Sequence, residues 1–169
     1  MLKPGTQAPD LHLPTVGDTT WRLSATRPVQ FHLLVFYRGY HCPLCRTYVH
    51  DLDVTQPEFA RRGVEVTALS CDGRERAEMA RDEWYLPRLR LAYGLKVEEA
   101  RRWGLFISRG VNDFEPAVFS EPGVFLLRPD RTVYAVFVQS MSSMRPRFNE
   151  LLPALDAIID RKLPPRGGA

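Results

Sequence analysis

Two cysteines three residues apart, Cys42 and Cys45, form a Cys-Pro-Leu-Cys motif in this chain of 169 residues. On the first turn of a helix, thiols at i and i+3 lie on one face, close enough to form a disulfide. Pro43 favours Cys42 as the N-cap, because a proline at the first helical position lacks an N–H that would be unpaired anyway. The helix N-terminus lowers the pKa of a thiol there from about 8.5. The motif therefore predicts reversible two-electron redox chemistry.

This geometry predicts that Cys42 is the attacking thiolate and that Cys45, one turn inside the helix, is the resolving thiol. Attack on a disulfide gives a mixed disulfide, and attack on a peroxide gives a sulfenic acid. In both cases Cys45 closes a disulfide that an external thiol must reopen. Arg38 and His41 precede the motif, and a positive charge on either would lower the thiol pKa further. The alternatives are that Arg38 binds a loop carbonyl and that His41 faces water.

The elements around the motif follow from apolar patterning. Residues 29–37 become almost entirely apolar, as in a central strand that is covered on both faces. A helix from Pro43 to about residue 61 follows and ends before Gly63, with Pro57 expected to kink or divide it. Residues 109–120 have little periodicity and are expected to form a loop. Similar signals predict a β-ribbon at 11–13 and 21–23, a strand at 64–69, helices through 79–84, 97–103 and 146–159, and a hairpin at 123–127 and 132–138.

This order predicts an α/β protein with a central mixed sheet flanked by helices and an N-terminal β-ribbon. We expect one domain over residues 1–163 and a flexible tail at 164–169. Basic residues are spread along the chain, often beside acidic ones, and the net charge is only +3, so nucleic acid is not an expected partner. The chain has no apolar run of the roughly 18 residues that a membrane span needs, and its N-terminus does not look like a signal peptide. A cytoplasmic location without membrane contact is therefore expected.

Three segments resemble the peroxiredoxin-like (alkyl hydroperoxide reductase/thiol-specific antioxidant) branch of the thioredoxin-like superfamily. They are the opening at residues 3–11, the Phe-Tyr-Arg-Gly of residues 36–39 with the Cys-Pro-Leu-Cys after it, and the strand and turn at 64–72. Pro122, before the strand at 123–127, matches the position of the thioredoxin-fold cis-proline. The resemblance implies a thioredoxin-like fold, a thiol-dependent oxidoreductase, and a cis Pro122 that forms a wall of the site beside Cys42.

The chain also departs from the family pattern of a Pro, a Thr and then the attacking Cys. Counted without a gap from the Phe-Tyr pair, Arg38 replaces the Pro, Cys42 replaces the Thr, and Cys45 falls at the Cys. The peroxide-orienting Arg of the family would fall at Pro122. The resemblance thus favours Cys45 as the attacking thiol, whereas helix geometry favours Cys42. It also leaves hydroperoxides and protein disulfides both open as substrates.

The implied partners are an oxidant and an external thiol reductant, either a thioredoxin-like protein or a low-molecular-weight thiol. Dimers are common in related folds, so a homodimer stays open, although the sequence carries no signature of one. No glycine-rich phosphate loop is present, and we expect no cofactor. Cys71 ends a strand, where a second resolving thiol is less expected than a small buried apolar side chain.

Two other functions are open for the cysteine pair. A zinc site would use Cys42, Cys45, His50 and His41, although structural zinc commonly takes two ligand pairs and the chain has one CxxC. The second alternative is a non-catalytic binding module with a thioredoxin fold, because a fold does not determine function.

Overall fold

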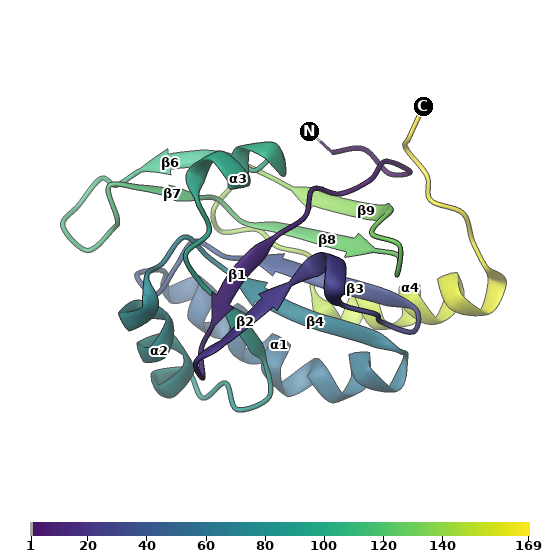
Figure 1. Cartoon of the computed structure of the whole chain (residues 1–169), viewed down its shortest axis with the longest axis horizontal. Coiled ribbons are helices and arrows are strands. Elements are labelled where there is room, and N and C mark those ends of the chain that lie inside the picture. The colour runs from purple at the N-terminus through teal and green to yellow at the C-terminus, as the bar shows by residue number, and fades with distance from the viewer. Residues whose placement is uncertain (1) are drawn as a thin grey trace.

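The computed structural model describes residues 2–169 and contains a seven-stranded mixed sheet with strand order β2-β1-β5-β4-β3-β8-β9 (Figure 1). A separate two-stranded sheet pairs β6 with β7. The strands are β1 (His12–Thr15), β2 (Thr19–Arg22), β3 (Phe31–Phe36), β4 (Val64–Leu69), β5 (Arg90–Ala92), β6 (Ile107–Arg109), β7 (Val118–Ser120), β8 (Gly123–Leu127) and β9 (Val133–Val138). The helices are a short 3-10 helix, η1 (Leu23–Ala25), and α1 (Pro43–Arg61), α2 (Arg74–Glu83), α3 (Val97–Arg102) and α4 (Phe148–Arg161).

Strand β3 lies at the centre of the sheet and leads into the cysteine motif. It pairs in parallel with β4 and antiparallel with β8, and all six of its residues are buried. Burial on both faces explains why five of the six residues are apolar and only His32 is polar, since no face of the strand meets water. The prediction of a central strand is therefore confirmed. The β3–α1–β4 unit presents the start of α1 at the carboxyl end of β3, where open α/β sheets usually bind ligands.

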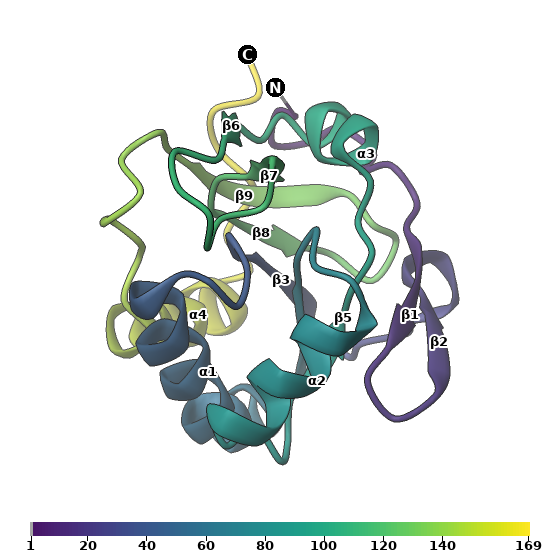
Figure 2. The same cartoon turned by 90° about the vertical axis from the view of Figure 1, so that its left-hand side faces the viewer.

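Two apolar cores lie on opposite faces of the sheet (Figure 2). One core packs α1, α2 and α4 against the side chains of Leu33 and Val35 on β3. The other packs the β1–β2 ribbon and α3 against Leu34 and Phe36. Successive residues of a strand point to opposite faces, so one apolar strand supplies both cores. This arrangement confirms the α/β class and the N-terminal β-ribbon.

The expected loop at residues 109–120 is confirmed only for its middle. Its two ends belong to strands, because β6 ends at Arg109 and β7 covers Val118–Ser120, and these strands pair as a short hairpin beside the main sheet (Figure 2). Pro57 does not divide α1, which is one helix from Pro43 to Arg61. Before α3, β5 joins the main sheet between β1 and β4. Within residues 2–169, no helix has both the length and the apolar character needed to cross a bilayer.

Candidate active site

Cys42 is the N-cap of α1, and Pro43 begins the helix, as the sequence predicted. The backbone N–H of Cys45 donates a hydrogen bond to Cys42 Sγ at 3.2 Å. An N-cap side chain normally accepts such a bond through oxygen, and here sulfur takes that role. Cys42 is 2% exposed and Cys45 is fully buried. Both thiols are free, so the described state is the reduced one.

The turn that delivers Cys42 is held by Asp72, which follows β4. Asp72 Oδ2 accepts a hydrogen bond from the backbone N–H of Tyr40 at 2.7 Å. Gly39 has a φ of +134°, and a Cβ added to it would lie 2.8 Å from Asp72 Oδ1. Only glycine fits this close approach without strain. Asp72 precedes α2 but does not cap it, because Gly73 is the N-cap and no side-chain hydrogen bond caps that helix. The carboxylate instead shapes the active-site turn.

Arg145 brings a guanidinium to both sulfurs from the segment before α4. Its Nη2 donates to Cys45 Sγ at 3.2 Å and to Cys42 Sγ at 3.8 Å. Its Nη1 donates to the Ser142 carbonyl oxygen at 2.8 Å, and its Cζ lies 5.6 Å from the Tyr48 ring centroid. No sequence pattern marked Arg145, because it lies 100 residues after Cys45 in the chain.

The two thiols have opposite pKa shifts. The pKa of Cys42 falls to about 6, because the Cys45 thiol and backbone N–H donate hydrogen bonds to its sulfur and Arg145 adds positive charge, with a smaller contribution from Arg38. Burial raises the pKa of Cys45 well above its usual value, and the negative charge forming on Cys42 raises it further. The two thiols titrate as a coupled pair. We place the negative charge of the pair on Cys42, because its pKa is the lower of the two. A thiolate is the nucleophilic form of cysteine, so this arrangement of charge favours Cys42 over Cys45 as the nucleophile.

Arg38 lies between two carboxylates and an aromatic ring. Its Nη2 is 3.2 Å from Glu115 Oε1, and its Nε is 3.2 Å from Glu121 Oε2. Its Cζ lies 4.8 Å from the Phe119 ring centroid. These partners belong to the β6–β7 hairpin and the residue after it, so Arg38 ties that hairpin to the active-site turn. The two carboxylates offset its positive charge, which is why its effect on the Cys42 pKa is small.

His41 does not supply the positive charge that the sequence suggested. Burial and the nearby charge of Arg38 lower its pKa to about 4, so its imidazole is neutral at pH 7. The ring does not simply face water either. It packs edge-on against Phe119 with the centroids 4.7 Å apart, and both ring nitrogens are buried without a hydrogen-bond partner among the described residues. Both sequence readings of His41 were therefore wrong.

Pro122 is not a cis-proline, because residues 2–169 contain no cis peptide bond. The chain runs from β7 into β8 through Glu121 and Pro122, and the backbone N–H of Glu121 donates to the Phe106 carbonyl oxygen at 2.7 Å. A trans bond is the ordinary geometry for such a connection. The expected cis-proline wall beside Cys42 is thus absent, and Glu121 contributes to the site instead through Arg38.

The zinc alternative lacks a ligand set in the part of the chain that the structure describes. No group of three His, Cys, Asp or Glu side chains there could hold a metal ion. His50, the proposed third ligand, donates from Nδ1 to the Trp84 carbonyl oxygen at 2.8 Å. Cys71 is partly buried, and its Sγ lies 3.8 Å from Ser120 Oγ. Burial raises the pKa of Cys71, which fits the expected structural role better than that of a second resolving thiol.

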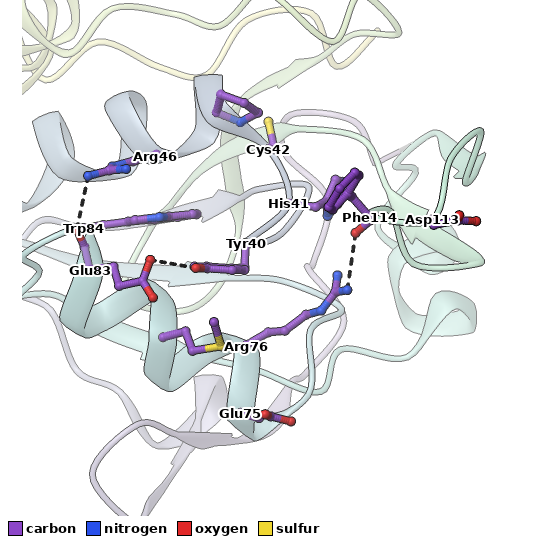
Figure 3. A pocket seen from close by; sticks show the side chains of 12 residues that line it. Tyr40, His41, Cys42, Arg46, Glu75, Arg76, Glu83, Trp84, Asp113 and Phe114 are labelled. Carbon is purple, nitrogen blue, oxygen red and sulfur yellow. Dashed lines mark hydrogen bonds between the residues drawn. The ribbon is translucent and has the colours of Figure 1, made fainter.

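A pocket of about 540 Å³ opens beside Cys42, between the start of α1 and the length of α2 (Figure 3). Trp84 and Tyr40 stack in it with their planes 12° apart. Arg46 from α1 and Arg76 from α2 line different sides of the pocket, where they donate to the carbonyl oxygens of Glu83 at 3.5 Å and Phe114 at 3.3 Å (Figure 3). The remaining lining residues are His41, Pro43, Glu75, Met79, Glu83, Asp113 and Phe114. Cys42 is therefore the thiol that borders an open space, whereas Cys45 lies behind it.

Sequence comparison finds two matches. A model described as the AhpC/TSA family matches residues 4–136. A 1-Cys peroxiredoxin from Dictyostelium discoideum is 26% identical over 148 residues, which cover 85% of this chain and 54% of that protein. The chain therefore spans about half the length of that curated relative.

Solved structures of low sequence identity share the fold. The peroxidoxin BcpB of Mycobacterium tuberculosis superposes with a TM-score of 0.75 at 21% identity, covering 94% of this chain and 99% of that one. The reduced 2-Cys peroxiredoxin of Plasmodium vivax gives a TM-score of 0.78 at 17% identity, covering 96% and 84%. These likenesses confirm the predicted thioredoxin-like fold.

Proposed function

Because the chain belongs to the AhpC/TSA family, we propose that it is a thiol-dependent peroxidase in which Cys42 attacks a hydroperoxide and Cys45 resolves the product. The observation that carries this proposal is the charge arrangement at the start of α1. One sulfur, at the helix N-terminus, has a pKa lowered to about 6, and the sulfur behind it is held as a thiol. Such a pair combines a nucleophile that is ionised at neutral pH with a reserve thiol one helical turn away.

In the first step the Cys42 thiolate attacks one oxygen of the peroxide. An S–O bond forms, the O–O bond breaks, and the leaving oxygen departs as alkoxide or hydroxide and takes up a proton. Cys42 becomes a sulfenic acid, oxidised by two electrons, and the peroxide becomes an alcohol or water. Fixed positive charge stabilises the negative charge that moves from sulfur to oxygen, and the Arg145 guanidinium donates to both sulfurs.

The second step follows from the change of charge on Cys42. While Cys42 is a thiolate, its negative charge helps to keep the pKa of Cys45 high. Conversion to sulfenic acid removes that charge, and Arg145, 3.2 Å from Cys45 Sγ, then favours the Cys45 thiolate. Cys45 attacks Cys42 Sγ, forms the disulfide and expels hydroxide, which leaves as water with the Cys45 proton. This sequence gives a reason for the closer approach of Arg145 to Cys45 than to Cys42.

Disulfide exchange is the second candidate function, since the same N-cap thiolate would attack a protein disulfide. The CxxC spacing supports it, because Arg38 and Cys42 stand where the family pattern has a Pro and a Thr. The burial of Cys42 favours the peroxidase, because a protein disulfide must bring a bulky chain to a sulfur that is 2% exposed. In both schemes the cycle needs an external thiol that reopens the Cys42–Cys45 bond.

Stopped-flow mixing of reduced protein with hydrogen peroxide tests the proposal. We expect oxidation of Cys42 to be at least about a hundredfold faster than that of free cysteine, given typical contributions of fixed charge. The Cys45→Ser protein should react as fast but stop at a sulfenic acid, which dimedone traps and mass spectrometry detects.

Cys42→Ser should lose the fast reaction, and Cys71→Ser serves as the matched control because Cys71 lies outside the pair. A sulfenic acid in Cys42→Ser, and none in Cys45→Ser, would reverse the assignment of the two thiols. A wild-type rate no faster than that of free cysteine would refute the peroxidase and leave disulfide exchange.

A further inference from the structure

We infer that the pocket beside Cys42 binds the reductant of the cycle and that this reductant is a small thiol carrying both carboxylate and ammonium groups. The inference rests on the proposed function, because it concerns the disulfide that the peroxidase step leaves behind. It assigns to this pocket one of the two reductant classes that the sequence left open. A thioredoxin-like protein is the competing class.

Access to the disulfide favours a small molecule. Cys45 is fully buried and does not line the pocket, whereas Cys42 does line it and is 2% exposed. An external thiol therefore reaches Cys42 Sγ more readily than Cys45, and this pocket leads to it (Figure 3). A protein reductant presents its cysteine on a broad surface and would have to enter a cleft that is lined by side chains of α1, α2 and the β6–β7 hairpin. A small thiol fits a cleft of about 540 Å³ more easily.

The pocket is also too large to serve hydrogen peroxide alone. Its volume of about 540 Å³ lies within the range of sites for small organic ligands, about 300–1,000 Å³. Hydrogen peroxide is close in size to water, which occupies about 30 Å³ in the liquid. Most of the space therefore remains for another molecule that reacts at the same sulfur.

The charges in the pocket match a ligand that carries both a positive and a negative group. Arg46 and Arg76 provide two guanidiniums, and neither forms a salt bridge with a described residue. Glu75 and Asp113 provide carboxylates that likewise have no cationic partner in residues 2–169. A third carboxylate, Glu83, accepts a hydrogen bond from the Tyr40 hydroxyl at 2.6 Å. A purely anionic ligand would meet these acids, so a zwitterion fits the lining better.

Unpartnered polar atoms point to the same ligand. Arg76 Nη2 donates to the Phe114 carbonyl oxygen at 3.3 Å, but its Nη1 is buried without a partner among the described residues. Both ring nitrogens of His41 are buried and unpartnered as well. A neutral imidazole needs one acceptor and one donor, which a peptide amide supplies together, and a guanidinium N–H needs an acceptor such as a carboxylate. Buried polar groups without partners are uncommon in folded proteins, so these atoms indicate a bound polar ligand.

The reduction balances with two molecules of the thiol. The thiolate of the first attacks Cys42 Sγ, forms a mixed disulfide and breaks the Cys42–Cys45 bond. Cys45 leaves as a thiolate beside Arg145 and takes up a proton. The second thiol attacks the sulfur of the first, releases the Cys42 thiolate and yields a small-molecule disulfide. Two electrons pass from the two thiols to the protein disulfide.

The test uses the full chain with its disulfide already formed, and reduction is followed by tryptophan fluorescence and by thiol counting. Glutathione is the zwitterionic probe, and mercaptoethanol, compared at equal thiolate concentration, is the uncharged one. We expect glutathione to reduce the protein at least about tenfold faster, the gain from one or two charged hydrogen bonds. A reduced thioredoxin supplies the protein arm and should be slower than glutathione.

Two variants test the pocket separately from the fold. Arg76→Gln and Arg46→Gln should each lower the ratio of the glutathione rate to the mercaptoethanol rate by about tenfold. Arg22→Gln is the matched control, because Arg22 is an exposed arginine on β2, outside the pocket, and its ratio should equal that of the wild type. A wild-type ratio near one, a ratio unchanged in both pocket variants, or a thioredoxin that outpaces glutathione would each overturn the inference. If peroxide fails to form the disulfide, diamide forms it, so failure of the peroxidase proposal is seen separately.

Discussion

Arg145 couples the two sulfurs, because one guanidinium lies within 3.2 Å of one and 3.8 Å of the other. Negative charge on either sulfur is therefore stabilised by the same group. The opposite pKa shifts of the two thiols place that charge on Cys42 in the reduced protein, and the proposed sulfenic acid step moves it to Cys45. In the proposed cycle Arg145 therefore serves two successive steps, which makes it the most informative residue to change.

We expect Arg145→Met to raise the pKa of Cys42 and slow peroxide reduction at pH 7. Wild-type activity should rise with pH through about 6 and be lost below it, because the thiolate is the reactive form. Each unit by which the pKa rises above the assay pH reduces the thiolate fraction about tenfold. The pH dependence of iodoacetamide alkylation measures this shift directly. Arg145→Lys, which keeps a positive charge, should fall between wild type and Arg145→Met, and an unshifted profile in Arg145→Met would contradict the role.

The sequence predicted the position of the cysteine pair but not the cation beside it. The placement of Cys42 at the N-cap follows from local rules, since a proline directly after the first cysteine of a CxxC motif favours the first helical position. The contact of Arg145 with Cys45 joins residues 100 positions apart, and no periodic pattern marks it. The charge state of His41 also depends on distant packing, because Phe119 arrives from the hairpin that the sequence did not reveal.

Among the elements, the turn between β3 and α1 determines where Cys42 lies. Its Gly39 combines a φ of +134° with a close approach to Asp72. We expect Gly39→Ala to lower the free energy of unfolding by about 1–3 kcal/mol, the usual cost of such backbone strain. It should also slow peroxide reduction, since the N–H of Tyr40 loses its alignment with Asp72. Urea denaturation measures the first effect and stopped-flow oxidation the second.

Gly73→Ala is the control for that substitution. Gly73 has a φ of −76°, and a Cβ added there meets no atom within 4 Å. This variant should change the free energy of unfolding by less than about 0.5 kcal/mol, as is usual for substitutions away from special features. Equal losses in both variants would show that flexibility of glycine, and not the contact with Asp72, governs the turn.

The elements differ in how well their sequences revealed them. Strand β4 (Val64–Leu69) was predicted to the residue, because a β-branched apolar run is bounded by a glycine and by a polar turn. The β6–β7 hairpin was missed because each strand has only three residues and the segment between them is mostly exposed. Its position depends instead on the ion pairs of Arg38 with Glu115 and Glu121, which join distant segments.

At the scale of the whole molecule, two neutral histidines make the stability of the fold depend on pH. Burial and the charge of Arg90 lower the pKa of His32 from 6.5 to about 3, and the pKa of His41 is about 4. His32 lies in the central strand, where its Nε2 is 2.9 Å from Thr67 Oγ1. Both rings stay neutral in the folded protein at a pH where they would be protonated in the unfolded chain.

We therefore expect stability to fall as the pH drops below about 6.5. Between the unfolded and folded pKa values, the unfolded chain binds more protons, so acid favours unfolding by about 1.4 kcal/mol per pH unit for each histidine. The two neutral histidines contribute fully to the free energy of unfolding above about pH 6.5. The contribution of His41 is lost as the pH falls to its folded pKa of about 4. Urea denaturation at about pH 6 and about pH 5 gives the slope. His32→Gln, which keeps a partner for Thr67, should reduce that slope by about half. An unchanged slope would mean that His32 does not titrate between the two states.

The placement of both sulfurs on the first turn of α1 has a consequence for the whole reaction cycle. Cys45 is tethered one turn from Cys42, so closure of the disulfide is a unimolecular event with a high effective molarity. No cysteine from another molecule has to arrive before the sulfenic acid meets more peroxide. Under the proposed mechanism, dilution therefore leaves the rate of this step unchanged.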